Sequence, residues 1–367
     1  MTRVSIITPV FNGAGTIGTA MDSVLGQGEA NWEHIIVDDG SNDRTGDTVL
    51  SRTDPRVKYF REPKCGRSIA RNIGIAHSVG EYLLFLDADD WLLPDSLQEH
   101  TCFLDEYPGF GVCVSDGYFC TDKGDRITSL SERRKDISSG RVADRVLVDP
   151  AVIGASNAAV IRGSVVKEHG LRFHPGLEVG EDWLFWVQAS FVTPFGFIPA
   201  MTCAYRWHEN STTLGTKREF RQNQLWIGRK IIMEDPGFNK LSPETRRIFF
   251  YQVLTDLLLG KPETQEAVFK SSQFADLSRS ARGELFRLAA VEYLLAGEHR
   301  RTALRWLEKS RMLAPGSTKN LLVERIAAGS PKLAGSLVRF WRRLQFRKGR
   351  ESLLDLDAKF RIPNSGF

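Results

Sequence analysis

Hydrophobic and polar residues alternate in blocks along the first 90 residues, and the period changes from one block to the next. Short apolar runs, typical of buried strands, occur at residues 4–11, 33–39, 56–62 and 81–90. The segments between them have helical spacing, at residues 15–27, 43–50 and 67–77. A further helix is predicted to begin at Pro94. Strands that alternate with helices predict an α/β fold, with a mostly parallel sheet flanked by helices.

From about residue 215 onwards the pattern becomes helical. One segment begins with Ser242 as N-cap and Pro243 as first helical residue, and it ends at Gly260. Residues 281–316 predict two antiparallel helices joined by a short glycine turn. The pair resembles a single tetratricopeptide hairpin, but no clear second copy accompanies it, so we predict no repeat array.

We place the domain boundary in the polar stretch at residues 210–217. The prediction is a catalytic domain at residues 1–213 and a basic α-helical C-terminal domain at residues 214–367. The first part contains 20 Lys/Arg and 29 Asp/Glu, whereas the second contains 29 and 16. Net charges of −9 and +13 favour two units with different partners. Two ordinary domains that merely differ in composition are the alternative.

The composition is that of a globular protein, with 42% hydrophobic and 26% charged residues. No apolar run approaches the length of about 18 residues that a membrane span needs, and no charged leader with a long apolar core begins the chain. The five cysteines are scattered and never form C-x-x-C, which is typical of reduced thiols. We therefore predict a cytoplasmic protein, with the inner face of the membrane as an alternative position.

A glycine motif follows the first predicted strand. Gly13, Gly15 and Gly18 form G-x-G-x-x-G, and Asp38 follows about 20 residues later, as in dinucleotide-binding proteins. In that fold the first glycine turns the chain directly after the strand. Here four residues, beginning with Pro9, separate the apolar run from Gly13. The glycines therefore indicate a loop before a helix, and we do not predict a nicotinamide or flavin site.

Acids are concentrated where the fourth predicted strand ends, in "LFLDADDWLLPDSL". Asp87 and Asp89 are two residues apart, and carboxylates so placed can bind one hard divalent cation together with substrate phosphates. Capping of the next helix by Asp89 or Asp90 is the alternative. An EF-hand is excluded, because Trp91 occupies a ligand position and the loop glycine is missing.

Five stretches, in this order, resemble a family-2 glycosyltransferase with the GT-A fold. They are "VSIITPVFNGAGTI", "NWEHIIVDDGSNDRT", "GRSIARNIGIAHSVGEYLLFLDADDWLLPDSL", "EDWLFW" and "YRWHENSTT". The resemblance covers about residues 3–213 and leaves the C-terminal 150 or so residues uncovered. It implies metal-dependent, inverting transfer of a sugar from a nucleotide-sugar, most simply a UDP-sugar.

The resemblance also implies which residues bind the donor. Asp39 would accept a hydrogen bond from the base, with Asp38 as the neighbouring candidate, and a plain turn is the alternative for both. Arg71, and more weakly Arg67, would lie toward the nucleotide or its phosphates, a surface charge being the alternative for Arg71. The remaining donor-binding residues implied are Thr8, Pro9, Phe11, Asn12, Asp87 and Ala88.

For the metal, Mn²⁺ or Mg²⁺, the resemblance implies Asp87 and Asp89 as the D-x-D pair and His208 as a metal ligand or phosphate contact. Asp182 would be the catalytic base, because inverting transfer needs a carboxylate opposite the leaving diphosphate to take the acceptor's proton. Glu181 and Trp183 would shape the acceptor site. Capping of a helix by Asp182 is the alternative and is compatible with catalysis.

The segment at residues 332–350 has seven Lys/Arg, no acid and interleaved aromatic and aliphatic residues. This pattern is typical of an amphipathic helix on a membrane surface. A helix packed on the domain with solvated arginines is the alternative, and no motif accompanies it that predicts nucleic-acid binding.

The predicted function is sugar transfer to a glycan or lipid-linked acceptor in the synthesis of surface polysaccharides or glycoconjugates. A sugar-phosphate nucleotidyltransferase is one alternative, although it would want a glycine-rich loop with a basic residue on the incoming nucleotide. A non-catalytic carbohydrate-binding subunit is the other.

Overall fold

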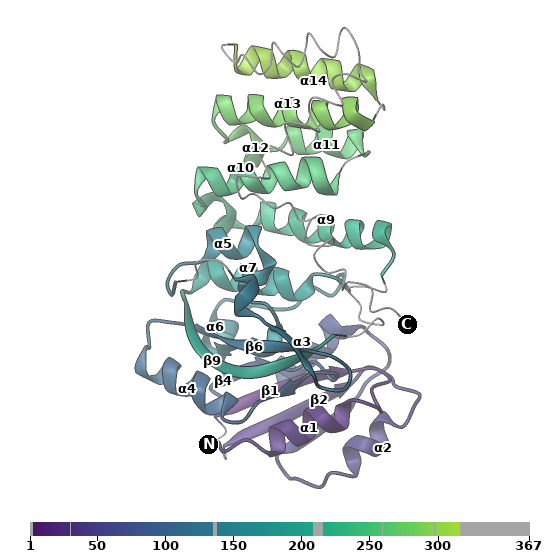
Figure 1. Cartoon of the computed structure of the whole chain (residues 1–367), viewed down its shortest axis with the longest axis vertical. Helices are drawn as coiled ribbons and strands as arrows, with labels where there is room; N and C mark the ends of the chain where they lie inside the picture. Colours follow the sequence, from purple (N-terminus) through teal and green to yellow (C-terminus); the bar gives the residue numbers. More distant parts are fainter. Residues whose placement is uncertain are drawn as a thin grey trace. The chain divides into compact units, whose positions relative to one another are not determined.

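The computed structural model describes residues 3–29, 31–134, 138–207, 216–258, 260–296 and 299–315. The chain forms two compact units, Met1–Lys240 and Leu241–Phe367, whose elements are labelled in Figure 1.

Four parallel strands form one half of the sheet in the first unit, in the order β3-β2-β1-β4. These strands are β1 (Val4–Val10), β2 (Trp32–Asp38), β3 (Val57–Arg61) and β4 (Tyr82–Phe85). Every residue of β1, β2 and β4 is buried, which explains why the sequence presents them as continuous apolar runs. All four predicted strands are confirmed.

The other half of the sheet has mixed directions. Its strands are β5 (Trp91–Leu92), β6 (Val112–Cys120), β7 (Arg126–Ser129), β8 (Ala159–Arg162) and β9 (Phe195–Arg206). β8 is antiparallel to β4 and β6, β9 is parallel to β6, and β5 and β7 pair antiparallel with β9 and β6. The predicted α/β fold, with parallel strands and flanking helices, is confirmed.

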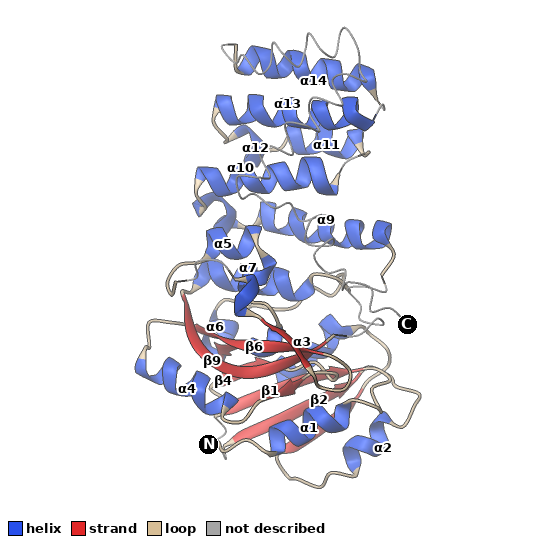
Figure 2. Ribbon diagram, viewed as in Figure 1, coloured by secondary structure: helices blue, strands red, loops and turns tan. Residues whose placement is uncertain are grey.

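Helices cover both faces of the sheet (Figure 2). Those of the first unit are α1 (Ile17–Leu25), α2 (Thr45–Leu50), α3 (Arg67–His77), α4 (Ser96–Glu106), α5 (Ala143–Val148), α6 (Gly163–Glu168), α7 (Glu181–Val192) and α9 (Arg218–Glu234). Short turns of other helix types lie at η1 (Ser131–Arg133), η2 (Pro150–Val152), η3 (Ser156–Ala158) and η4 (Pro236–Lys240).

Alternation along β1 shows how the two faces are filled. Ile6 belongs to a buried cluster with residues of α1 and α4, whereas the next residue, Ile7, lies against Gly74 of α3. Successive strand residues point to opposite faces, so one strand contributes to both hydrophobic layers. Beyond α3, the rings of Phe85, Phe173 and Phe185 are packed together.

The predicted start of α4 at Pro94 is wrong. The helix begins at Ser96, after Asp95 with a left-handed φ of 61°. The amide of Leu93 donates a hydrogen bond to the carbonyl of Thr202 in β9. Because the chain is still paired with β9 at Leu93, it has to turn sharply before the helix can begin.

The second unit is helical where it is described, as predicted. It contains α10 (Pro243–Tyr251), a π-helical turn η5 (Gln252–Leu257), α11 (Pro262–Phe269), α12 (Ser272–Ala275), α13 (Arg279–Ala296) and α14 (Arg300–Leu313). The Ser242 hydroxyl accepts a hydrogen bond from the amide of Thr245 at 3.1 Å, so the predicted N-cap is confirmed. The Ser310 hydroxyl, late in α14, donates to the Gly283 carbonyl, early in α13. The predicted antiparallel pair is therefore also confirmed.

The first unit extends beyond residue 213, where the sequence placed the boundary, because α9 packs against α7. A Cβ on Gly228 of α9 would lie 3.6 Å from the Trp183 ring and 3.7 Å from the Leu177 side chain. None of the helices in the described part of the chain is long and apolar enough to cross a membrane.

Candidate active site

The carboxyl ends of β1, β2 and β4 lie at one edge of the sheet, because these strands are parallel neighbours. The amide of Asp39, just after β2, donates to the carbonyl of Val10 at the end of β1, at 2.8 Å. The loop with Asp87 and Asp89 follows β4 directly. The acids predicted from the sequence are therefore brought to the same edge.

The glycine-rich loop after β1 has its amides engaged by the loop after β2. The amides of Asn12, Gly13 and Ala14 donate to the side chains of Ser41, Thr45 and Asp43, at 2.8, 2.9 and 3.1 Å. A dinucleotide fold needs such amides for the pyrophosphate. The interpretation of these glycines as loop residues is therefore favoured.

Two of the residues predicted to line the nucleotide pocket have no exposed side chain. Thr8 and Pro9 are buried, and the Thr8 hydroxyl lies 2.8 Å from Nε2 of His34. Burial lowers the pKa of His34 to about 3, so this ring is neutral. Thr8 is therefore a buried residue beneath the surface of the loop and does not line it. Phe11, in contrast, is 42% exposed, and the Lys64 ammonium lies 3.9 Å from its ring centroid.

Asp38 and Asp39 are both buried but have different partners. Asp38 accepts hydrogen bonds from the Ser41 amide and the Tyr59 hydroxyl, at 2.7 and 2.5 Å. Asp39 accepts from the amides of Cys65 and Gly66, at 2.5 and 3.0 Å, just before α3. Asp38 thus fixes β2 to β3, whereas Asp39 joins the end of β2 to the start of α3.

A buried guanidinium connects two of the predicted site acids. Arg71 is 2% exposed and donates to Asp87 at 2.6 Å and to Glu181 at 2.9 Å. Burial alone would lower the pKa of Arg71, but the carboxylates of Asp87 and Glu181 outweigh it and raise the pKa. For Asp87 the effect of burial has the opposite sign and would raise the pKa, but the positive charges of Arg71 and Arg67 outweigh it and lower the pKa. Both groups of the Arg71–Asp87 pair are therefore charged.

Asp90 is a site residue that sequence reasoning weighed only as a helix cap. It is 3% exposed, and it accepts from the amide of Arg206 at 2.8 Å and from the Asn157 side chain at 3.3 Å. Burial, with the charges of Asp89 and Asp87, raises its pKa well above the ordinary value. The Arg206 guanidinium also donates to the Asp89 carbonyl at 2.8 Å. The end of β9 is thus hydrogen-bonded to the acidic loop. In the sequence, the only indication that Arg206 belongs to the site was its position two residues before His208.

His208 lies outside the described residues. Among the residues that the structure describes, no three His, Cys, Asp or Glu side chains are grouped so as to hold a metal by themselves. Asp87 and Asp89 would thus supply two carboxylates, which fits Mg²⁺ or Mn²⁺ that takes further ligands from phosphates and water. Burial is the main cause of the raised pKa of Asp90, and the charges of Asp89 and Asp87 add to it; a bound cation would relieve the part that comes from these charges.

At the first turn of α7, the two members of the Glu-Asp pair, Glu181 and Asp182, differ in burial and in their partners. Glu181 is 4% exposed and lies against Arg71, with Arg67 at 3.7 Å. Asp182 is half-buried, and its carboxylate accepts from the amide of Trp183. Trp183 is buried, and its indole donates to the Val146 carbonyl of α5 while Arg229 lies over its ring. The structure therefore does not place Glu181 or Trp183 on an open acceptor surface.

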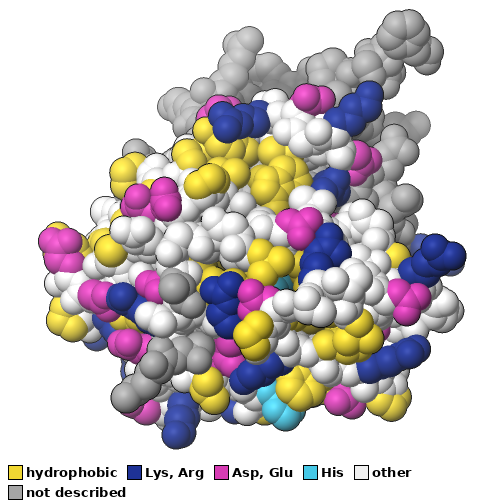
Figure 3. Space-filling model, turned by 90° about the horizontal axis from the view of Figure 1, so that it is seen from below, with side chains coloured by type: hydrophobic (Ala, Val, Ile, Leu, Met, Phe, Trp, Pro, Cys, Tyr) yellow, Lys and Arg dark blue, Asp and Glu magenta, His cyan; other side chains and the backbone are white. Residues whose placement is uncertain are grey.

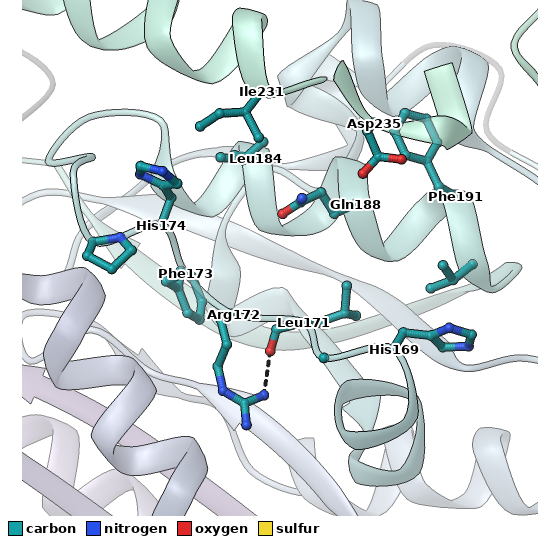
Figure 4. Close-up of a pocket in the computed structure, with 13 residues that line it drawn as sticks. His169, Leu171, Arg172, Phe173, His174, Leu184, Gln188, Phe191, Ile231 and Asp235 are labelled. Atoms are coloured by element: carbon teal, nitrogen blue, oxygen red, sulfur yellow. Dashed lines mark hydrogen bonds between the residues drawn. The ribbon is translucent and has the colours of Figure 1, made fainter. Parts of the chain in front are cut away.

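A pocket of about 270 Å³ lies elsewhere, between residues 169–175, α7 and the end of α9. In Figure 4, Gln188 and Leu184 of α7 face Ile231 and Asp235. None of the predicted site residues lines it. Leu184 follows Asp182 by two positions, and two residues turn a helix by about 200°. Asp182 therefore points away from this pocket, which is separate from the candidate site.

On the face of the molecule seen in Figure 3, acidic and basic side chains are interspersed with hydrophobic ones, and neither charge forms a continuous patch.

Acids and the buried Arg71 guanidinium thus gather at the carboxyl ends of parallel strands in an α/β domain. The model of glycosyl transferase family 2 matches residues 5–170. This match indicates a domain of the glycosyl transferase family 2 type within residues 5–170.

Relatives agree with this assignment. An uncharacterized glycosyltransferase of Rickettsia felis is 27% identical over 269 residues, which are 72% of this chain and 43% of the relative. The putative teichuronic acid biosynthesis glycosyltransferase TuaG of Bacillus subtilis is 35% identical over 123 residues, which are 31% of this chain and 49% of TuaG. The chain spans less than half the length of either of these relatives.

Solved structures show the same fold at low identity. S. aureus TarS 1-349 in complex with UDP-GlcNAc has a TM-score of 0.57 and 16% identity, with 85% of this chain and 90% of that chain covered. The mannosyltransferase PcManGT from Pyrobaculum calidifontis, in complex with GDP-Man and Mn²⁺, has a TM-score of 0.52 and 17% identity, with 93% and 87% covered. The GT-A type of fold is therefore confirmed.

Proposed function

We propose that this chain transfers a sugar from a nucleotide-sugar, most simply a UDP-sugar, to a glycan or lipid-linked acceptor, in a metal-dependent and inverting reaction. The observation that carries the proposal is the gathering of Asp39, Arg71, Asp87 and Asp89 at one sheet edge, with Asp182 at the start of α7. The complexes of TarS with UDP-GlcNAc and of PcManGT with GDP-Man and Mn²⁺ support it, since their folds are similar.

The donor base would lie beside Phe11 and Asp39. An exposed aromatic ring offers a face on which a base can stack. The Asp39 carboxylate accepts hydrogen bonds from the Cys65 and Gly66 amides, and a carboxylate has about four acceptor positions. It therefore retains capacity for the N–H of a uracil. Asn12 would lie near the same pocket.

The diphosphate would lie over the acidic loop. Asp87, Ala88 and Asp89 come at the end of β4, and a divalent cation held there would neutralise the charge that develops on the leaving diphosphate. Arg67 is half-exposed and can add a second positive charge. His208 would be a further metal ligand or phosphate contact, which the anchoring of Arg206 two residues earlier in the chain supports.

Asp182 would be the base. Inversion requires the acceptor hydroxyl to attack from the face opposite the diphosphate, where a carboxylate accepts its proton. Of the two acids at the start of α7, Asp182 is the less buried and is not paired with Arg71. Glu181 and Trp183 would act on the acceptor only through the position of α7.

A sugar-phosphate nucleotidyltransferase is the second candidate function. It is disfavoured by one observation: the amides of the glycine-rich loop already donate to Ser41, Thr45 and Asp43, so they are not available for an incoming triphosphate. A non-catalytic subunit is disfavoured because the acids of both the D-x-D and the Glu-Asp pair are retained. For location, we propose the cytoplasm, with contact to the inner face of the membrane through residues 332–350.

Metal dependence tests the proposal. UDP binding to the wild type is expected to require Mn²⁺ or Mg²⁺ and to be lost on addition of a chelator. Asp89→Ala should abolish the metal-dependent part of binding while the melting temperature without ligand stays close to the wild type, because Asp89 is not a core residue. Titration calorimetry of UDP, GDP and dTDP with and without metal measures this. Equal nucleotide affinity with and without chelator in the wild type would falsify metal dependence.

A further inference from the structure

The buried Arg71 guanidinium forms hydrogen bonds to acids in both halves of the site. Its Nη2 donates to Asp87, the first acid of the D-x-D, and its Nη1 donates to Glu181. These two acids are 94 residues apart in the sequence but share one planar cation. The ring of Phe173 lies 5.0 Å from the same guanidinium and restricts its movement.

The surroundings of Arg71 are held firmly. Asn72, the next residue of α3, both donates to the Phe173 carbonyl and accepts from the Phe173 amide, at 2.7 and 2.9 Å. The Ser68 hydroxyl donates to the Leu177 carbonyl at 2.8 Å. Through these bonds α3 fixes the chain that leads into α7. A change at one carboxylate of the bridge is therefore transmitted to the other rather than absorbed by a flexible loop.

Glu181 has its charge committed inside the protein. Its side chain is 5% exposed, and the same oxygen, Oε1, faces Arg71 at 2.9 Å and Arg67 at 3.7 Å. A carboxylate so enclosed cannot bind an acceptor that arrives from solvent. Its effect on the reaction must pass through the two arginines.

We infer that Glu181 is a positioning residue of the donor site, which acts through Arg71 on Asp87 and couples occupancy of that site to the first turn of α7. This inference rests on the proposed function and assigns a role within the same site. It replaces the acceptor contact that the sequence suggested for Glu181 with an electrostatic one.

The charges fix the direction of the effect. Arg71 and a divalent cation compete for Asp87, because both are attracted to the same carboxylate. Glu181 offsets part of the Arg71 charge and so leaves Asp87 more available to a cation. Without the Glu181 charge, Arg71 is balanced by Asp87 alone, and cation binding weakens. Because Glu181 lies on the far side of Arg71 from Asp87, its charge acts on the cation over a longer distance, where one unit charge changes such an affinity by roughly tenfold.

The experiment measures nucleotide affinity as a function of Mn²⁺ concentration, without any acceptor. Whichever of UDP, GDP and dTDP binds the wild type is used. Glu181→Gln keeps the size and one hydrogen bond to Arg71 but loses the charge, and we expect it to need about ten times more Mn²⁺ for half-maximal binding. Glu178→Gln is the matched control, because Glu178 is exposed in the same loop and should leave the Mn²⁺ requirement unchanged.

A second variant keeps the test open if Glu181→Gln does not fold. Arg71→Lys preserves the positive charge but cannot bond two carboxylates with one planar group. It should alter the Mn²⁺ requirement, and an unchanged requirement in a folded Arg71→Lys overturns the bridge on its own. Where Glu181→Gln does fold, combining the two variants should add less than the two single effects together. Independent, additive effects overturn the bridge.

The outcomes separate the two proposals. A wild type that binds none of the three nucleotides with any metal contradicts the proposed function itself. A wild type with Mn²⁺-dependent binding and a folded Glu181→Gln with the same Mn²⁺ requirement overturns only the inference, and leaves Glu181 with a purely structural role.

Discussion

At the scale of single residues, neighbouring acids in this site differ in what their oxygens contact. Asp90 is enclosed by Arg206 and Asn157, and Glu181 is enclosed by Arg71 and Arg67. Their neighbours Asp89 and Asp182 are only half-buried. A buried carboxylate that is bonded to the protein organises its surroundings, whereas an accessible one can meet a cation or a substrate. In each of these two pairs, one acid is therefore enclosed by the protein and the other is more accessible.

Asp182→Asn tests the assignment of the base. Asparagine keeps the size and can still accept the bond from the Trp183 amide, so α7 should begin as before. Proton acceptance is lost, and a general base contributes about 10²–10⁴ in rate. We expect unchanged donor affinity and at least a hundredfold slower sugar transfer, measured by calorimetry and by single-turnover kinetics.

Asp39→Asn is the reciprocal variant. It removes a charged acceptor at the proposed base-binding position and is expected to weaken nucleotide binding more than the chemical step. The backbone amides of Cys65 and Gly66 also lose their carboxylate partner, so the melting temperature has to be recorded beside the affinity.

For the first of these two variants, near-normal sugar transfer by Asp182→Asn would contradict the assignment of Asp182 and move the role of catalytic base to another acid.

At the scale of elements, two glycines differ in whether packing requires them: Gly74 lies at a close contact between α3 and β1, whereas Gly15 of the G-x-G-x-x-G motif does not. A Cβ on Gly74 of α3 would overlap Cγ2 of Ile7 in β1, whereas a Cβ on Gly15 would meet nothing within 4 Å. Overpacking of a core contact costs about 1–3 kcal/mol. We expect Gly74→Ala to lower the free energy of unfolding by that amount and Gly15→Ala to change it by less than about 0.5 kcal/mol.

The Gly15→Ala variant also tests the interpretation of the G-x-G-x-x-G motif. In a dinucleotide fold the second glycine lets the backbone approach the pyrophosphate, so alanine there would impair binding. Here Gly15→Ala should leave nucleotide affinity unchanged. Denaturant unfolding gives the stabilities and calorimetry the affinities, and a large loss of affinity in Gly15→Ala would contradict our interpretation of the loop.

The elements that could be predicted from the sequence are those with a regular local pattern. The apolar runs of β1 to β4 and the spacing of α3 identify themselves within a dozen residues. β5 has two residues and exists because it pairs with β9, more than 100 positions later. The bond of Arg71 to Glu181 spans 110 positions. Contacts of that range leave no periodicity in the sequence, so the bridge and the fastening of Asp90 had to come from the structure.

At the scale of the whole molecule, charge is divided between the two ends of the chain. Residues 1–213 have a net charge of −9 and residues 214–367 a net charge of +13. An acidic half suits a cation-dependent site, whereas a basic half suits an anionic partner. The most basic segment, residues 332–350, lies outside the described residues, and its role is a proposal from sequence alone. A lipid-linked acceptor would be reached most easily by an enzyme held at the membrane surface.

Membrane binding through residues 332–350 is the prediction that follows. Near an anionic surface each basic residue contributes roughly 1 kcal/mol, so the seven Lys/Arg of this segment could hold the protein on a bilayer even if half of them engage. We expect cosedimentation with phosphatidylserine vesicles, none with phosphatidylcholine vesicles, and progressive release as salt shortens the screening length. Deletion of residues 332–350 should abolish the binding but leave metal-dependent nucleotide binding intact. If the deletion variant cosediments as well as the full chain, the segment is not the membrane contact, and the basic charge of this half has another partner.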